Sequence, residues 1–119
     1  MITLEIPELT PSLNVKRNAH WASKHRARKR WSMLVLVAKS EAQVFVRPLI
    51  ERAKVTVERY GGKVLDHDNA LGGCKDLIDG LRDNGLIVND DPAHLELHFA
   101  QHPGAKIKKR TIVRIEAMA

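Results

Sequence analysis

The chain has 119 residues, of which 44% are hydrophobic and 29% charged, a composition typical of one globular domain and not of a disordered segment. Its single cysteine, Cys74, excludes an internal disulfide framework and favours a reducing, cytoplasmic location. The longest strongly apolar run, residues 33–38, is far too short to cross a bilayer, so we expect no membrane partner. Residues 1–5 do not resemble a signal peptide.

The net charge of +6 is unevenly distributed along the chain. Residues 16–30 and 106–114 are rich in Lys and Arg and contain no acid, whereas residues 66–91 hold seven aspartates and only two cations. Basic segments bind polyanions, and the acidic segment would repel the same polyanion unless a divalent cation neutralised it. The pattern therefore predicts nucleic-acid binding beside a metal site. The side chains expected to contact DNA are Lys16, Arg17, Lys24, Arg26, Arg28, Lys29, Arg30, Lys106, Lys108 and Arg110.

The first half of the chain predicts strand, loop, helix and strand. Apolar residues alternate with polar ones over residues 2–6, which indicates a short strand, and residues 9–18 are typical of a loop. Residues 23–45 contain no Gly or Pro and predict a long helix, cationic in its first half and apolar in its second, with Pro48 ending the region. Clean alternation over residues 53–59 predicts the next strand.

The second half predicts a helix followed by two strands. The helix should begin near Asp68 or Asn69 and end at Gly85, with one apolar stripe along it. Strands follow at residues 95–99 and 107–115. The stripe comprises Leu71, Cys74, Ile78 and Leu81, which makes a buried, inert Cys74 more plausible than a nucleophile.

This order of elements predicts a single α/β (α+β) domain over residues 1–119, with two main helices and a mixed sheet. So short a chain has a small core, which favours oligomerisation. The helical stripe together with Gly72 and Gly73 could let another backbone approach closely, so we expect a homodimer.

The chemistry is concentrated in the acidic segment. Residues two apart in an extended chain project to the same side, so Asp66 and Asp68 could offer two carboxylates to one point, and Asp90 or Asp91 could supply a third. Carboxylates, waters and phosphate oxygens are the ligands that Mg²⁺ prefers, and such a site can activate water for attack on a phosphodiester. Lys75 follows Asp68 by two helical turns, which would place both on one helical face, and it could approach a phosphate oxygen.

Purely structural roles explain the same residues one at a time. Asp68 or Asn69 could be a helix N-cap, and Asp66 a solvated turn residue. Asp90 and Asp91 could form a turn, and Lys75 could be an ordinary exposed lysine. These alternatives correspond to a nucleic-acid-binding protein without catalytic activity.

The motifs taken together resemble the RusA family of Holliday junction resolvases, which is common in phages and prophages. The resemblance implies a homodimeric endodeoxyribonuclease that uses Mg²⁺, or Mn²⁺ in its place, to nick paired strands of four-way DNA junctions in recombination and repair. The family's first two catalytic aspartates correspond to Asp66 and Asp68, its active-site lysine to Lys75, and its third aspartate to Asp90, or to Asp91 with a one-residue shift. Forks and flaps are the alternative substrates. The resemblance rests on Asp66, Asp68, Asn69, Lys75, the run 79–81, Gly85 and residues 89–91, with looser similarity at residues 11–14, His20 and Trp21.

Overall fold

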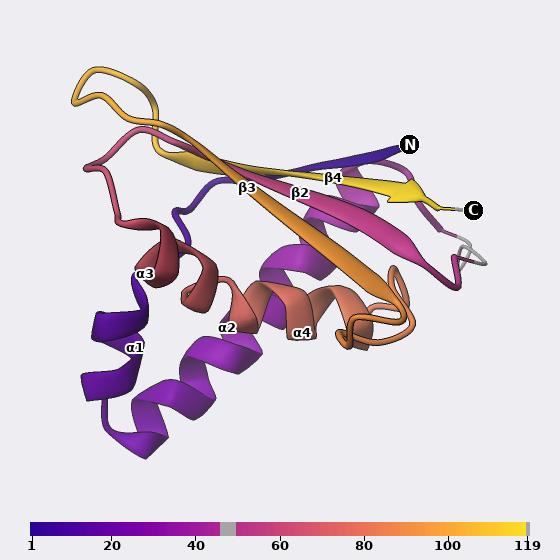
Figure 1. Cartoon of the computed structure of the whole chain (residues 1–119), viewed down its shortest axis with the longest axis horizontal. Coiled ribbons are helices and arrows are strands. Elements are labelled where there is room, and N and C mark those ends of the chain that lie inside the picture. The colour runs from indigo at the N-terminus through magenta and orange to yellow at the C-terminus, as the bar shows by residue number, and fades with distance from the viewer. Residues whose placement is uncertain (46–49, 119) are drawn as a thin grey trace.

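The computed structural model describes residues 1–45 and 50–118, so the predicted role of Pro48 lies outside the described residues. A four-stranded mixed sheet packs against helices, which confirms the predicted mixed architecture (Figure 1). The elements in chain order are β1 (Ile2–Ile6), α1 (Leu13–Asn18), α2 (Trp21–Glu41), β2 (Ala53–Tyr60), α3 (His67–Gly72), α4 (Lys75–Asp83), β3 (Leu95–His102) and β4 (Arg110–Ala117).

The strand order in the sheet is β1-β4-β2-β3. Strand β4 runs antiparallel to both β1 and β2, whereas β2 and β3 are parallel. Parallel neighbours need a crossover connection, and α3 and α4 lie within it. The acidic segment, residues 66–91, is therefore contained in the crossover that follows the carboxyl end of β2.

Helices α2 and α4 cover one face of the sheet (Figure 1). Every second residue of β2 and β4 is buried on this face, which is the strand periodicity that the sequence predicted. Gly80 of α4 lets the two helices approach closely, because a Cβ there would lie 3.2 Å from the Cα of Ser32 in α2. The core includes Leu4, Ile6, Trp31, Val35, Val55, Val57, Leu77, Leu81, Val113 and Ile115.

Helix α2 ends at Glu41, earlier than predicted. The N–H groups of Gln43 and Val44 donate to the carbonyls of Ser40 and Lys39, both at 3.0 Å. With Gln43 at a φ of 60°, this is a Schellman motif, which ends a helix by satisfying its last carbonyls.

The single helix predicted after Asp68 is divided into α3 and α4. The division falls at Gly73, where a Cβ would lie 1.6 Å from the carbonyl oxygen of Pro11. The close approach of Pro11 explains why glycine is required here, and the helix resumes at Lys75. The expectation that Asp68 and Lys75 share one helical face is therefore wrong.

Residues 13–18, predicted as part of a loop, form α1. The side chain of Ser12 caps this helix by accepting a hydrogen bond from the N–H of Val15 at 3.2 Å. Leu13 packs on Gly72, where a Cβ would come within 2.7 Å of its side chain. The glycine pair thus contacts the chain's own residues, so the surface suggested for a partner backbone is already occupied.

Strand β4 begins at Arg110, later than predicted. Ile107 is exposed and, with Lys106 and Lys108, belongs to the β3–β4 connection, residues 103–109. A bridge between Gly62 and Gly104 ties this connection to the loop that leaves β2. Within the described residues, no helix has both the length and the apolar character needed to cross a membrane.

Candidate active site and nucleic-acid interface

Asp66 is the N-cap of α3. Its Oδ1 accepts a hydrogen bond from the N–H of Asn69 at 3.0 Å, and its Oδ2 accepts one from Asn69 Nδ2 at 2.6 Å. These hydrogen bonds hold the pKa of the Asp66 carboxyl below its ordinary value. Asp68 lies in the first helical turn and is exposed. The two carboxylates thus flank a helix start and not an extended strand end, and the capping residue is Asp66.

Two polar side chains hold the segment before α3 at the carboxyl ends of β2 and β3. The Gln101 amide donates to the carbonyl of Leu65 at 2.7 Å and accepts from its N–H at 2.8 Å. Buried Arg59 donates to the carbonyls of Lys63 at 2.8 Å and Thr10 at 3.1 Å, and desolvation lowers the pKa of this guanidinium. The sequence did not lead us to predict a role for either residue. The signal that could have found them is a polar side chain at a strand position that faces the core.

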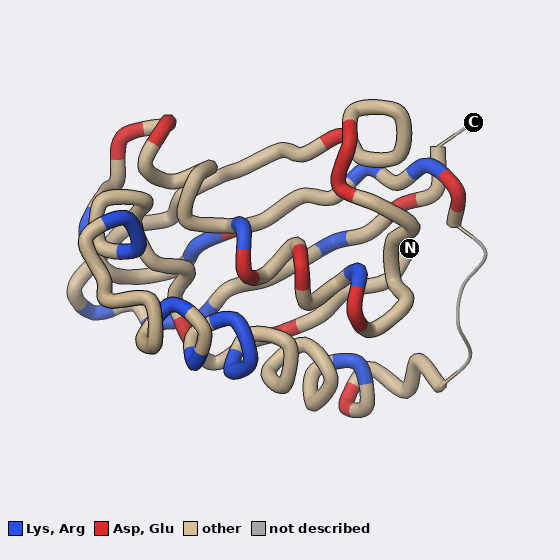
Figure 2. Tube along the Cα trace, turned by 90° about the horizontal axis from the view of Figure 1, so that it is seen from below, with Lys and Arg blue, Asp and Glu red and all other residues tan. Residues whose placement is uncertain are grey.

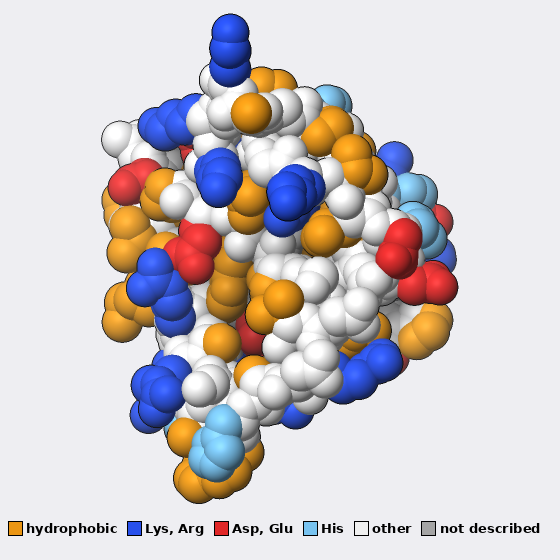
Figure 3. Space-filling view, turned by 90° about the vertical axis from the view of Figure 1, so that its left-hand side faces the viewer, with side chains coloured by type: hydrophobic (Ala, Val, Ile, Leu, Met, Phe, Trp, Pro, Cys, Tyr) orange, Lys and Arg blue, Asp and Glu red, His pale blue; other side chains and the backbone are white. Residues whose placement is uncertain are grey.

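Helix α3 lies between the two basic segments of the sequence. On one side α1, which carries Lys16 and Arg17, packs against it through Leu13. On the other side is the β3–β4 connection with its lysines, joined to the loop before α3 by the Gly62–Gly104 bridge. The space-filling view of this end shows Lys and Arg side chains above and below a smaller number of acidic ones (Figure 3).

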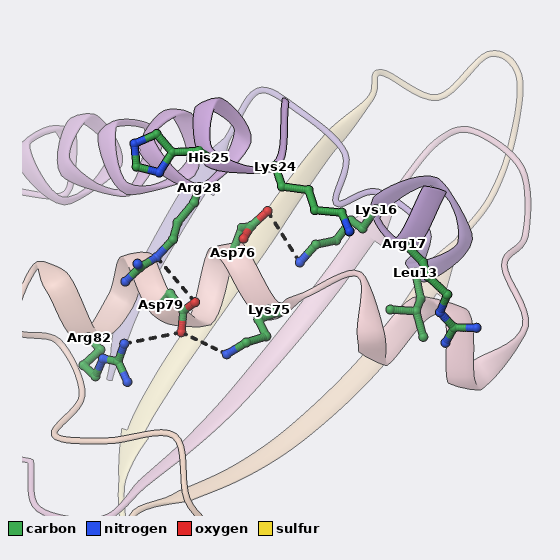
Figure 4. A pocket seen from close by; sticks show the side chains of 10 residues that line it. All are labelled: Leu13, Lys16, Arg17, Lys24, His25, Arg28, Lys75, Asp76, Asp79 and Arg82. Carbon is green, nitrogen blue, oxygen red and sulfur yellow. Dashed lines mark hydrogen bonds and ion pairs between the residues drawn. The ribbon is translucent and has the colours of Figure 1, made fainter. Parts of the chain in front are cut away.

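A second charged group lies where α4 packs beside α2. Asp79 is buried, and its carboxylate lies 3.5 Å from Lys75 Nζ, 3.6 Å from Arg82 Nη2 and 3.6 Å from Arg28 Nε (Figure 4). One turn earlier, buried Asp76 lies 3.5 Å from Lys16 Nζ. The Lys and Arg positions of α2 concentrate in one half of that helix, facing the alternating acidic and basic positions of α4 (Figure 2). Sequence reasoning did not assign a role to Asp76 or Asp79.

The two candidates for the third acidic ligand differ in surroundings. Asp90 lies 3.8 Å from both Lys75 Nζ and Arg82 Nη1. Asp91 instead stabilises the turn in which it lies, because its Oδ1 accepts hydrogen bonds from the N–H groups of Ala93 and His94. The same oxygen contacts His94 Nδ1 at 2.7 Å, and this contact lowers the pKa of Asp91. Asp90 is therefore the one that faces Lys75.

The three predicted metal ligands do not come together. Across residues 1–45 and 50–118, no group of three or more His, Cys, Asp and Glu side chains is arranged to hold a metal ion. Mg²⁺ is commonly held by one or two carboxylates, with waters and substrate phosphate oxygens completing its shell. Asp66 and Asp68 supply two exposed carboxylates at the start of α3, and the Asp66 oxygens also accept hydrogen bonds from Asn69, whereas Asp90 is engaged with Lys75 and Arg82.

The basic residues predicted to contact DNA fall into different environments. Lys16 and Arg28 form ion pairs with carboxylates of α4. Arg30 donates two hydrogen bonds, from Nε and Nη2, to Oε2 of Glu8. Arg110 lies over the ring of Tyr60, 4.3 Å from its centroid. In the part of the chain that the structure describes, no ion pair is found for Arg17, Lys24, Arg26 or Lys29.

Cys74 is buried in the core, as predicted. Its thiol donates to the carbonyl of Ala70 at 3.3 Å, and burial raises the pKa of Cys74 to about 12. A thiol with this pKa is protonated at neutral pH and is not a nucleophile.

Comparison of the chain with protein-family models and with curated proteins gives no match. The likeness to the RusA family therefore rests on the sequence motifs alone.

Proposed function

We propose that the protein is a Mg²⁺-dependent endodeoxyribonuclease that cuts branched DNA, with the four-way junction as its substrate, in the cytoplasm. The observation that supports this most is the position of Asp66 and Asp68 at the start of α3, between α1 and the β3–β4 connection. DNA attracted by both basic segments would lie across these carboxylates.

Each group of residues would have a separate role in the proposed reaction. Asp66 and Asp68 would hold magnesium, which supplies a Lewis acid that polarises the phosphate group. The cations of α1, Lys24 and Arg28 of α2, and the lysines of the β3–β4 connection would hold the DNA arms through their phosphates. Lys75 would stabilise negative charge that develops near the scissile phosphate, since its side chain is 64% exposed and its ammonium lies close to Asp79 and Asp90. Two symmetric nicks require two such sites, so the active species would be a homodimer.

The test is incubation of the purified protein with labelled four-way junction, fork, flap and duplex DNA, in Mg²⁺, in Mn²⁺ or in EDTA. Cleavage of the junction that depends on the metal and exceeds cleavage of duplex is the expected result. Preference for forks or flaps would correct the substrate, and absence of cleavage in either metal would overturn the enzyme proposal. Glu41→Gln at the exposed end of α2 is the matched control for acid-to-amide changes in α3.

A second candidate function is nucleic-acid binding without catalysis. It is favoured by the structural partners of the predicted ligands: Asp66 caps α3, Asp90 pairs with Lys75 and Arg82, and Asp91 caps its own turn. Such a protein would bind DNA equally well in EDTA and cut none of the substrates.

A further inference from the structure

A cleft of about 660 Å³ opens between α1, α2 and α4. It is strongly cationic, because six Lys and Arg side chains and one His surround only two carboxylates. The lining residues are Leu13, Lys16, Arg17, Lys24, His25, Arg28, Lys75, Asp76, Asp79 and Arg82 (Figure 4).

The two carboxylates lie at the inner wall of the cleft and direct four of the six cations. Asp76 and Asp79 are both buried, and their ion pairs with Lys16, Arg28, Lys75 and Arg82 have N–O distances of 3.5 or 3.6 Å. Charge-assisted hydrogen bonds are shorter, at roughly 2.7–2.9 Å. The cations are therefore held in place by the carboxylates while keeping N–H donors for another anion.

The remaining two cations leave the cleft with excess positive charge. Arg17 of α1 and Lys24 of α2 line it, and neither has an ion-pair partner among the described residues. A concave surface with one sign of charge focuses the electrostatic potential and concentrates the opposite ion there. Asp83 and Asp90, outside the lining, also pair with Arg28, Lys75 and Arg82 at 3.8 Å. Four carboxylates still balance only part of the charge of six cations, so the complementary ligand is a polyanion.

We propose that this cleft binds the phosphodiester backbone of a nucleic-acid strand. The proposal rests on the proposed function for the identity of the polymer as DNA, but binding in the cleft requires neither metal nor cleavage. It also divides the basic segment 16–30 into two classes. Arg17 and Lys24 serve the cleft, whereas Arg26 and Lys29 are exposed on α2 outside its lining.

Matched pairs of charge-removing substitutions test this division. R17Q with K24Q removes the two unpaired cations of the cleft, and R26Q with K29Q removes two from outside the cleft lining. All four side chains are exposed, so both variants should keep the wild-type circular dichroism and melting temperature. Affinity is measured by fluorescence anisotropy in EDTA, with a labelled thymidine oligonucleotide, a duplex and a four-way junction, at several salt concentrations.

The cleft pair should lose about tenfold or more in affinity, and the slope of log K against log salt should fall by roughly 1.4 on single strands or 1.8 on duplex. The control pair should lose less than about threefold. A larger loss of affinity for the oligonucleotide than for the duplex identifies a single strand as the occupant of the cleft. Equal losses of affinity for the oligonucleotide and the duplex identify a duplex arm. Equal losses for the two variants, or none for the cleft pair, would overturn the proposal.

This experiment separates the proposal from the proposed function, because EDTA prevents cleavage. Wild-type protein that cuts nothing in Mg²⁺, while the cleft pair alone loses affinity, would overturn the nuclease and leave the cleft assignment standing. Wild-type protein that binds none of the three DNAs would overturn the cleft assignment.

Discussion

The ammonium of Lys75 lies 3.8 Å from Oδ2 of Asp90, which joins the start of α4 to the connection before β3. Lys75 also lies 3.5 Å from Asp79 Oδ1, so one exposed cation is shared by two carboxylates from different segments. Arg82 contacts the same two carboxylates, at 3.6 and 3.8 Å. We therefore expect the fold to tolerate substitution of Lys75, since Arg82 remains to neutralise Asp79 and Asp90.

Lys75→Ala should therefore lower turnover much more than affinity. Only interactions that are stronger in the transition state accelerate the reaction, so we expect at least about a tenfold loss of turnover with less than about a threefold change in junction affinity. Single-turnover cleavage and anisotropy binding measure the two quantities, with Lys54→Ala on β2 as the control. If turnover survives, Lys75 is an ordinary exposed lysine.

Asp68→Asn should abolish most cleavage and leave DNA binding intact. The substitution removes one negative charge with almost no change in size, so cleavage should fall by about two orders of magnitude or more if Asp68 holds magnesium. Affinity for the junction in EDTA should stay equal or rise, because a repulsive charge beside the phosphates is gone. Cleavage assays of Asp68→Asn beside Glu41→Gln measure this effect. Full activity of Asp68→Asn would show that Asp68 only occupies the first turn of α3 and holds no metal.

Gly73→Ala should destabilise the fold. The added methyl group would lie 1.6 Å from the carbonyl oxygen of Pro11, so the chain before α1 or the break between α3 and α4 must move. We expect a loss of at least about 2 kcal/mol in the free energy of unfolding, measured by urea denaturation. Gly72→Ala is the control, because its methyl meets only side-chain atoms of Leu13, and it should cost less.

The capping hydrogen bonds of Asp66 predict a loss of stability in acid. Because the folded-state pKa is depressed below 3.8, the unfolded chain binds the proton more tightly. The stabilisation is complete above the unfolded-state pKa and is lost as the pH falls through the folded-state pKa. Urea unfolding between about pH 6 and pH 2 should show a weaker acid dependence for Asp66→Asn than for the wild type. Identical dependences would contradict the assigned role.

We predict a homodimer in solution, because paired nicks need two sites related by a twofold axis. Analytical ultracentrifugation at micromolar concentration should give twice the chain mass of 13.4 kDa, with and without a junction. A monomer under both conditions would exclude the paired-nick mechanism but not nicking of one strand.

Local patterns predicted the parts of the fold that depend on local causes. Strand β2 was predicted at residues 53–59 and is observed at Ala53–Tyr60, because alternating burial follows directly from the two-residue period of a strand. Helix α1 was missed although Ser12 is a typical N-cap, since the polar, proline-containing run around it favoured a loop. The division between α3 and α4 depends on Pro11, which is remote in sequence and which no periodicity reveals.

The candidate site shows the same limit. Asp66 and Asp68 are close in sequence, so their proximity could be predicted. The hydrogen bonds by which Gln101 and Arg59 hold the preceding segment in place could not. The role of Asp79 depends on Arg28 of another helix, and this contact forms only when α2 and α4 pack together. Charge distribution predicted nucleic-acid binding beside a metal site, but not that side chains of the acidic and basic segments would pair with each other.

Arg59 has a consequence for motion near the candidate site. Its guanidinium binds the carbonyls of Thr10 and Lys63, so the segments that lead into α1 and α3 are fastened to the same buried group of β2. Neither segment can leave the sheet without breaking hydrogen bonds of a cation that has little access to water. We therefore expect α1 and α3 to open as one cooperative unit, so that their amide hydrogens exchange together.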